Sequence, residues 1–352
     1  MKAEFWKGRK VLLTGHTGFK GSWLSLLLQE LGADLYGISL PPEAESLFNV
    51  ANIESAYRKS FYLDIRELND LSRKIQEISP EIVIHMAAQP LVLESLKDPL
   101  STFSTNILGT ANVLEAVRNL NIKPLSVLAV TSDKCYENFD TKRYFVESDK
   151  LGGEDPYSAS KASSEIIVRS YYKSYLEEMQ VGVATARAGN VIGGGDFARD
   201  RLIPDAFRAH RDKKPMIVRN FEAIRPWQHV LDPLIGYLKL AARLSISPSV
   251  FSGAWNFGPN PDQHKEVSFV LRKFNESMAL ETLNQEKNKV EMGILKLDST
   301  KSIENLEWKS SISLNSTVEL SIDWYQAYLD GQNMTAFTKN QILKILGYIR
   351  DN

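Results

Sequence analysis

Residues 10–21 read KVLLTGHTGFKG, an apolar run followed at once by glycines at 15, 18 and 21. The three glycines form the pattern G-x-x-G-x-x-G, and residues 23–31 continue as an apolar-periodic helix. Glycine permits a tight turn and lets backbone N–H groups approach a pyrophosphate at a helix N-terminus. A strand, this turn and a helix in succession predict a dinucleotide site, with a plain glycine-rich turn as the alternative.

Apolar runs and helical repeats alternate along the next part of the chain. We expect strands at 33–40, 61–65, 81–86, 125–131 and 182–187, and helices at 68–78, 106–120 and 157–179. Strands that alternate with helices at this spacing indicate βαβ units. The predicted fold is therefore α/β, a Rossmann-type doubly wound parallel sheet.

The pattern changes near Gly189, where short helices and Pro-containing loops replace the strand rhythm. We predict that residues 1–189 form the dinucleotide-binding domain, to which a segment near 225–258 returns. Residues 190–352 are expected to form mainly a smaller, mixed α/β substrate-binding lobe. Such a lobe belongs over the carboxyl ends of the strands, where ligands bind in open α/β sheets.

Composition narrows the class of protein. The chain has 352 residues, with Lys+Arg 42 against Asp+Glu 43, so no strong charge draws it to nucleic acid or to a membrane surface. Its single cysteine, Cys135, permits no intrachain disulfide. The first residues lack the apolar segment of a secretory signal, and five scattered histidines predict no metal site. We expect a cytoplasmic protein.

A second motif is Tyr157-Ser158-Ala159-Ser160-Lys161. The spacing of four places Tyr157 and Lys161 on one helix face, where an ammonium is expected to lower the pKa of the phenol. A phenolate of that kind is a usable base. The alternative is a surface aromatic beside a lysine. The glycine turn, Asn106 and a strand that ends before Ser132 favour the functional interpretation.

These residues resemble the extended short-chain dehydrogenase/reductase family over nearly the whole chain. The resemblance implies an NAD cofactor, a nucleotide-sugar substrate, and a homodimer or homotetramer formed through the helices near 106–120 and 157–178. The residues that it assigns to the cofactor are Gly15, His16, Thr17, Gly18, Phe19, Gly21, Asp64, Ile65, Ala87, Ala88, Gln89, Asn106, Tyr157 and Lys161.

Two positions leave the cofactor contacts open. The second strand ends Gly-Ile-Ser-Leu at 37–40, without the acid that binds an adenosine ribose, so this position does not separate NAD from NADP. Asp64 either bonds the adenine amino group or caps a helix.

Ser132 is followed by Asp133 and Lys134, which resembles the nucleotide-sugar 4,6-dehydratase branch of the family, and within it the members that act on CDP-glucose. The resemblance implies C4 oxidation by NAD, loss of water across C5 and C6, and return of the hydride to C6. Tyr157 takes the C4 hydroxyl proton and Ser132 bonds that oxygen. Asp133 is the acid and Lys134 the base; a structural ion pair between these two is the alternative.

Further residues are assigned to the substrate. Arg225 suits the pyrophosphate, because guanidinium groups match phosphate oxygens; Asn190 and Arg201 are additional candidates, and Gln89 is expected to face the hexose. Two tryptophans, Trp227 and Trp255, either stack on the base or belong to the core.

One loop departs from the branch. Residues 144–147 read Tyr-Phe-Val-Glu where CDP-glucose dehydratases commonly carry Gly-Tyr-Arg-Glu. This loop is expected near the sugar or the nucleotide, so the change bears on the substrate more than on the reaction.

Two other functions stay open. One is an epimerase, or a dehydratase of another nucleotide sugar; an acid and a second ionisable group after Ser132 favour elimination. The other is a non-catalytic sensor or scaffold, which has no need of Ser132, Tyr157 and Lys161.

Overall fold

The computed structural model describes residues 3–138, 143–284 and 294–351. Its centre is a seven-stranded sheet in the order β11-β6-β5-β4-β1-β2-β3, in which all neighbours are parallel. The predicted doubly wound α/β fold is confirmed. The strands are β1 (Lys10–Thr14), β2 (Asp34–Ser39), β3 (Tyr57–Tyr62), β4 (Ile82–His85), β5 (Ser126–Val130), β6 (Gly182–Ala188) and β11 (Gly253–Phe257).

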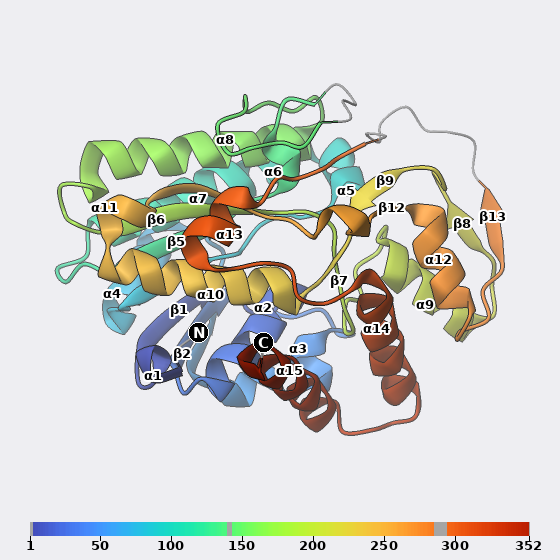
Figure 1. Ribbon diagram of the computed structural model, residues 1–352. Helices are drawn as coiled ribbons and strands as arrows, with labels where there is room; N and C mark the ends of the chain where they lie inside the picture. The colour runs from blue at the N-terminus through green and yellow to red at the C-terminus, as the bar shows by residue number, and fades with distance from the viewer. Residues whose placement is uncertain (1–2, 139–142, 285–293, 352) are drawn as a thin grey trace.

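Helices cover both faces of this sheet (Figure 1). On one face, α4 (Leu68–Ile78), α7 (Gly109–Arg118) and α8 (Pro156–Tyr171) share a buried apolar cluster with the strands. On the other, α2 (Phe19–Glu30) and α10 (Leu231–Ile246) belong to a larger cluster. Because both faces are covered, the strands read as continuous apolar runs rather than as alternating ones.

Short elements after β6 build a smaller lobe, to the right of the sheet in Figure 1. Three two-stranded ladders hold it: β7 with β10, β8 with β13, and β9 with β12. Its elements are β7 (Val191–Ile192), α9 (Leu202–Asp212), β8 (Met216–Val218), β9 (Ile224–Pro226), β10 (Gln228–His229), η5 (Pro261–Gln263), β12 (His264–Glu266), α12 (Val267–Asn275), β13 (Thr282–Asn284) and α14 (Leu314–Leu329).

The remaining elements are short segments and the C-terminal helix: α1 (Ala3–Trp6), α3 (Leu47–Val50), η1 (Ile53–Ala56), α5 (Val92–Lys97), α6 (Pro99–Phe103), η2 (Ser104–Leu108), η3 (Asp133–Cys135), η4 (Tyr172–Leu176), α11 (Pro248–Phe251), α13 (Thr300–Leu306) and α15 (Met334–Asp351). None of the helices in the described part of the chain combines the length and apolar character needed to cross a bilayer.

One apolar core joins the lobe to the sheet. Trp23 of α2 donates from Nε1 to the carbonyl oxygen of Gly194, 2.9 Å away. Trp324 of α14 packs on the same glycine, where a Cβ would lie 2.0 Å from its Cγ. The two halves therefore meet through tight backbone contacts, and the carboxyl ends of the strands face the lobe.

Two expected elements differ from the structure. The strand predicted at 61–65 is β3, Tyr57–Tyr62, because its register on β2 begins with Leu35 opposite Tyr57. The helix predicted at 106–120 begins earlier, as α6 at Pro99, and passes through the π-helical η2 before α7. Asp98 caps that start by accepting a hydrogen bond from the Ser101 N–H.

Candidate active site

The turn between β1 and α2 contains two backbone contacts that only glycine allows. Gly15 has a φ of +73°, and a Cβ there would lie 2.6 Å from the backbone nitrogen of Ala87. A Cβ at Gly21 would lie 2.2 Å from the Gly15 carbonyl oxygen. Gly18 is the N-cap of α2, and no side chain caps this helix end by a hydrogen bond. Such a cradle fits the pyrophosphate of a dinucleotide.

In this turn, the side chains of His16 and Thr17 point into the protein. His16 is fully buried, and its Nε2 lies 2.8 Å from the Ser60 Oγ. Burial lowers its pKa to about 4. Thr17 bonds through Oγ1 to the Ser39 Oγ and the Leu40 carbonyl at the end of β2. A cofactor contact from His16 therefore rests on its backbone. Phe19 is half-buried at the start of α2.

The helix-cap alternative for Asp64 is wrong. The N-cap of α4 is Glu67, whereas Asp64 accepts hydrogen bonds from the backbone and guanidinium of Arg66. The two charges lie 2.6 Å apart at a partly exposed position. Ile65 is buried against Gly109, where a Cβ would lie 2.5 Å from its Cδ1.

Asn106 fixes the loop that follows β4, in which Ala87 and Ala88 precede Gln89. Its Oδ1 accepts from the Gln89 N–H at 2.8 Å, and its Nδ2 donates to the Gln89 carbonyl at 3.0 Å. The Gln89 amide bonds to Thr102 Oγ1 and to both backbone groups of Leu91. Both polar ends of this side chain are thus engaged within the protein, whereas the prediction placed it against the hexose.

Helix α8 brings the predicted proton-relay residues to the end of β5. The Ser132 hydroxyl lies close enough to the Tyr157 phenol to influence its pKa, and the Lys161 Nζ lies 3.4 Å from the Val130 carbonyl oxygen. Tyr157 is 8% exposed and Lys161 6% exposed. The structure therefore places Ser132, Tyr157 and Lys161 in one buried site.

Burial dominates the acid–base properties of this site. It raises the pKa of Tyr157 to about 12, although the nearby Ser132 hydroxyl opposes the change. The direction is opposite to the prediction, because the loss of solvation outweighs nearby positive charge. Burial also lowers the pKa of Lys161 to about 8, against the raising effect of Glu165.

Asp133 and Lys134 follow in the short turn η3. Ser132 caps this turn: its Oγ accepts from the Lys134 N–H at 3.2 Å and donates to the Asp133 Oδ1 at 3.1 Å. Asp133 is 3% exposed, and its Oδ2 has no hydrogen-bond partner within the described ranges. Burial raises the pKa of Asp133, against the positive charges of Lys134, Lys20 and Arg225. A carboxyl group of this kind is suited to act as an acid.

Lys20 is a site residue that the sequence analysis missed. It lies in the first turn of α2, and its charge interacts with Asp133, Lys161 and Arg201. Loss of solvation inside the site lowers the pKa of Lys20 to about 8. The sequence signal that could have identified Lys20 is its position inside the glycine motif, at a helix end that faces the carboxyl edge of the sheet.

Three of the predicted substrate residues follow β6, whereas Gln89 lies after β4. Arg225 in β9 is 8% exposed, and its charge acts on Asp133. Arg201 lies beside the site but forms an ion pair of 2.9 Å with Asp196. Asn190 follows β6, and its carbonyl oxygen accepts from the Gln228 N–H.

Both tryptophans considered for the base belong to the core. Trp227 and Trp255 are 2% exposed, and their indole N–H groups donate to the carbonyl oxygens of Lys265 and Phe251.

The loop at 144–147 is anchored to the sheet. Phe145 is buried, and the Glu147 Oε1 accepts from the Asn256 N–H of β11 at 2.8 Å. The one glutamate that the loop shares with the dehydratase pattern therefore has a structural contact.

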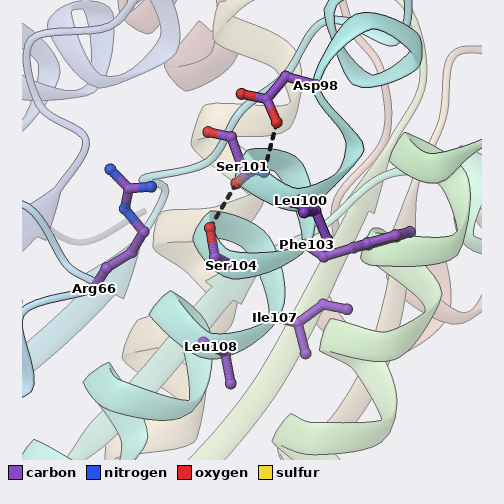
Figure 2. Close-up of a pocket in the computed structure, with 8 residues that line it drawn as sticks. All are labelled: Arg66, Asp98, Leu100, Ser101, Phe103, Ser104, Ile107 and Leu108. Carbon is purple, nitrogen blue, oxygen red and sulfur yellow. Dashed lines mark hydrogen bonds between the residues drawn. The ribbon is translucent and has the colours of Figure 1, made fainter.

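An open pocket of ≈ 690 Å³ lies elsewhere, on α6 and η2 (Figure 2). None of the catalytic candidates lines this pocket. Its lining consists of Arg66, Asp98, Leu100, Ser101, Phe103, Ser104, Ile107 and Leu108.

The chain is similar to nucleotide-sugar dehydratases along most of its length. Residues 12–320 match a family model described as GDP-mannose 4,6 dehydratase. A CDP-glucose 4,6-dehydratase of Salmonella typhimurium is 42% identical over 349 residues, which cover 96% of each protein. A dTDP-glucose 4,6-dehydratase of Xanthomonas campestris pv. campestris is 24% identical over 91% of this chain and 96% of the relative.

Solved structures share the fold. The DesIV double mutant, a dTDP-glucose 4,6-dehydratase of Streptomyces venezuelae with NAD and DAU bound, has a TM-score of 0.77 and 21% identity, covering 92% of this chain and 98% of that one. A UDP-glucose 4-epimerase of Thermotoga maritima has a TM-score of 0.78 and 19% identity, with 91% and 99% covered. With the family model and the 42% identical relative, these findings show that the chain belongs to the GDP-mannose 4,6-dehydratase family, within the extended short-chain dehydrogenases/reductases.

Proposed function

We propose that the protein converts CDP-glucose to CDP-4-keto-6-deoxyglucose and water, a step toward deoxysugars of O-antigen or related polysaccharides. The observation that carries the proposal is the Asp133–Lys134 pair, which directly follows Ser132 at the carboxyl end of β5; the charge of Asp133 acts on Tyr157. An epimerase needs no acid and second base at that position. The 42% identical CDP-glucose 4,6-dehydratase supports the choice of nucleotide.

NAD is the proposed cofactor, and the glycine turn fits it. Backbone groups at Gly15 and Gly18 hold the pyrophosphate at the start of α2, and Lys161 binds the nicotinamide ribose. When bound, NAD accepts a hydride from C4 of the sugar and returns it to C6.

Four side chains handle the protons. Tyr157, whose phenolate form the positive charge of bound NAD would favour, removes the proton of the C4 hydroxyl while Ser132 bonds that oxygen. Lys134 takes the C5 proton, and Asp133 protonates the departing C6 hydroxyl, so that water leaves. The buried Asp133 carboxyl, with its raised pKa, is suited to carry that proton.

The substrate pyrophosphate is assigned to Arg225, with Arg201 and Asn190 as further contacts. Arg225 is mostly buried beside Asp133, so its charge acts in a poorly hydrated site where a phosphate contact is strong. We also assign the protein to the cytoplasm, a reducing compartment that suits the free thiol of Cys135.

A mass spectrum of CDP-glucose after incubation with the purified protein and NAD tests the reaction. We expect a product lighter by one water, and no such product from the Tyr157→Phe variant. dTDP-, UDP- and GDP-glucose serve as parallel substrates. Water loss from one of those alone would reassign the nucleotide. An unchanged mass together with an altered sugar configuration would establish an epimerase instead.

A homodimer is proposed through an apolar surface on α6, η2 and α8. Leu100 is 78% exposed, Leu108 60% and Ile166 58%. These side chains lie on elements that contact one another, so they extend over two neighbouring helices. A second copy that presents the same face covers both, as a two-fold interface requires.

A further inference from the structure

Three residues of α8 meet three consecutive residues at the end of β5. Tyr157 lies beside Ser132, Glu165 accepts from the Thr131 hydroxyl, and Lys161 donates to the Val130 carbonyl. The helical residues are spaced by four and share one face. The strand residues are adjacent. The position of the helix along the strand therefore decides whether the phenol and the ammonium reach their partners.

Glu165 is the most firmly held of the three helical residues. Its carboxylate accepts from the Thr185 hydroxyl at 2.7 Å and from the Arg187 Nε and Nη2 at 2.9 and 2.7 Å. The Glu165 and Arg187 side chains are each 3% exposed. A carboxylate that is buried, paired and accepts four hydrogen bonds permits little displacement of its helix.

Arg187 extends the anchor to the loop after the catalytic turn. Its Nη1 donates to the Tyr136 hydroxyl at 2.8 Å and to the Glu147 carbonyl at 3.2 Å. The Tyr136 hydroxyl in turn donates to the Asn256 Oδ1 of β11 at 2.7 Å. Strands β5, β6 and β11 are thus tied to one point on α8.

We propose that Glu165, held by Arg187, is a positioning residue of the catalytic centre: it sets α8 against the end of β5 and places a negative charge one helical turn from Lys161. Glu165 touches neither substrate nor cofactor and acts through Lys161. Its function in catalysis rests on the proposed dehydratase activity, whereas its charge interaction with Lys161 is a property of the protein alone.

Two side chains, Glu165 and Cys135, could supply negative charge to Lys161, and only Glu165 does so. Cys135 stays a neutral thiol, because burial raises its pKa well above the usual value. His85, at the end of β4, is neutral, because burial lowers its pKa to about 3. Lys20 from α2 adds positive charge, which opposes the ammonium. Glu165 raises the pKa of Lys161, while burial, the larger effect, lowers it.

The first test measures this charge interaction without activity. Unfolding of the wild type, Glu165→Gln, Lys161→Met and the double variant is compared at pH 7 and at pH 9.5. At pH 7 we expect Glu165→Gln to lower the folding equilibrium constant at least tenfold more when residue 161 is lysine than when it is methionine. At pH 9.5 the difference should shrink, since Lys161 is then neutral. Equal effects in both backgrounds would overturn the proposal.

The second test measures the pH dependence of kcat. In Glu165→Gln, the loss of activity at high pH should begin at least about one pH unit lower, with an unchanged KM for CDP-glucose. Thr185→Val is the matched control, because it removes one hydrogen bond to Glu165 and keeps the charge; it should lower Tm and leave the pH profile in place. Identical profiles for wild type and Glu165→Gln would refute the catalytic part.

Two safeguards keep the tests decisive. If Glu165→Gln does not fold, the pair Glu165→Gln with Arg187→Met leaves no unpaired buried charge and should show the same lowered pH limit. A wild type that unfolds with the expected coupling yet removes no water from any nucleotide sugar would contradict the proposed function and keep the Glu165–Lys161 interaction.

Discussion

Replacement of Lys161 by methionine should make the protein more stable at neutral pH. Lys161 is 6% exposed, and burial lowers its pKa from 10.5 to about 8. The unfolded chain therefore binds the proton more tightly than the folded one, and folding at pH 7 carries a charge into a poorly solvated site. Methionine has a similar length and no charge, so it removes this cost.

The magnitude follows from the two pKa values. A difference from 10.5 to about 8, at about 1.4 kcal/mol for each pH unit, corresponds to ~3 kcal/mol. The variant also loses the 3.4 Å bond to the Val130 carbonyl, worth about 1 kcal/mol. The net gain is ~2 kcal/mol. For a chain of this length, with an unfolding entropy of about 2.1 cal/mol/K per residue, that is about 3 °C in Tm.

The difference in stability between Lys161→Met and the wild type depends on pH. As pH rises from about 8 to 10.5, folded Lys161 loses its proton while the unfolded chain keeps it, so the wild type gains stability and the advantage of the variant fades. Calorimetry from pH 7 to 10 measures both trends. Lys150→Met is the control, because that side chain is 85% exposed and should show neither effect. A Lys161→Met variant less stable than wild type at pH 7 would refute the reasoning.

Three further outcomes are expected. Gly21→Ala should lower Tm by several degrees, because its Cβ would meet the Gly15 carbonyl oxygen at 2.2 Å, whereas Gly18→Ala, with 3.4 Å to the same atom, should leave Tm nearly unchanged; thermal melts compare them. Asp133→Asn keeps the shape but cannot donate the acid proton, so water loss measured by mass should slow by about 10²–10⁴-fold with an intact fold. Leu108→Glu should halve the mass seen by light scattering, and an unchanged mass would exclude the proposed dimer face.

The sequence predicted the elements whose pattern is local. Buried parallel strands read as apolar runs, so the strands expected at 10–14, 81–86 and 125–131 match β1, β4 and β5 within one or two residues. The edge strand β3, YRKSFY, faces water with much of its length and offers no such run. The glycine turn was recognisable because Gly15 and Gly21 stand where the backbone leaves no room for a side chain.

The sequence pattern did not predict the directions in which these side chains point. His16 turns inward because Gly37 of β2 leaves room for its ring, a contact between residues 21 positions apart. Gln89 is engaged by Thr102, and Asp64 by Arg66, so their partners decide their direction. Glu165 reads as an ordinary helical glutamate until β6 brings Arg187 beside it.

The outermost pairing of the main sheet bears on the order of events during synthesis. β11 lies beside β6 with Gly253 opposite Ala184, a separation of 69 residues along the chain. Until residue 257 has left the ribosome, β6 presents one side without a partner, and unpaired edges recruit other chains. A fragment that stops near residue 189 should therefore aggregate rather than bind a dinucleotide. The main sheet is therefore completed only by a strand that is synthesised after much of the smaller lobe.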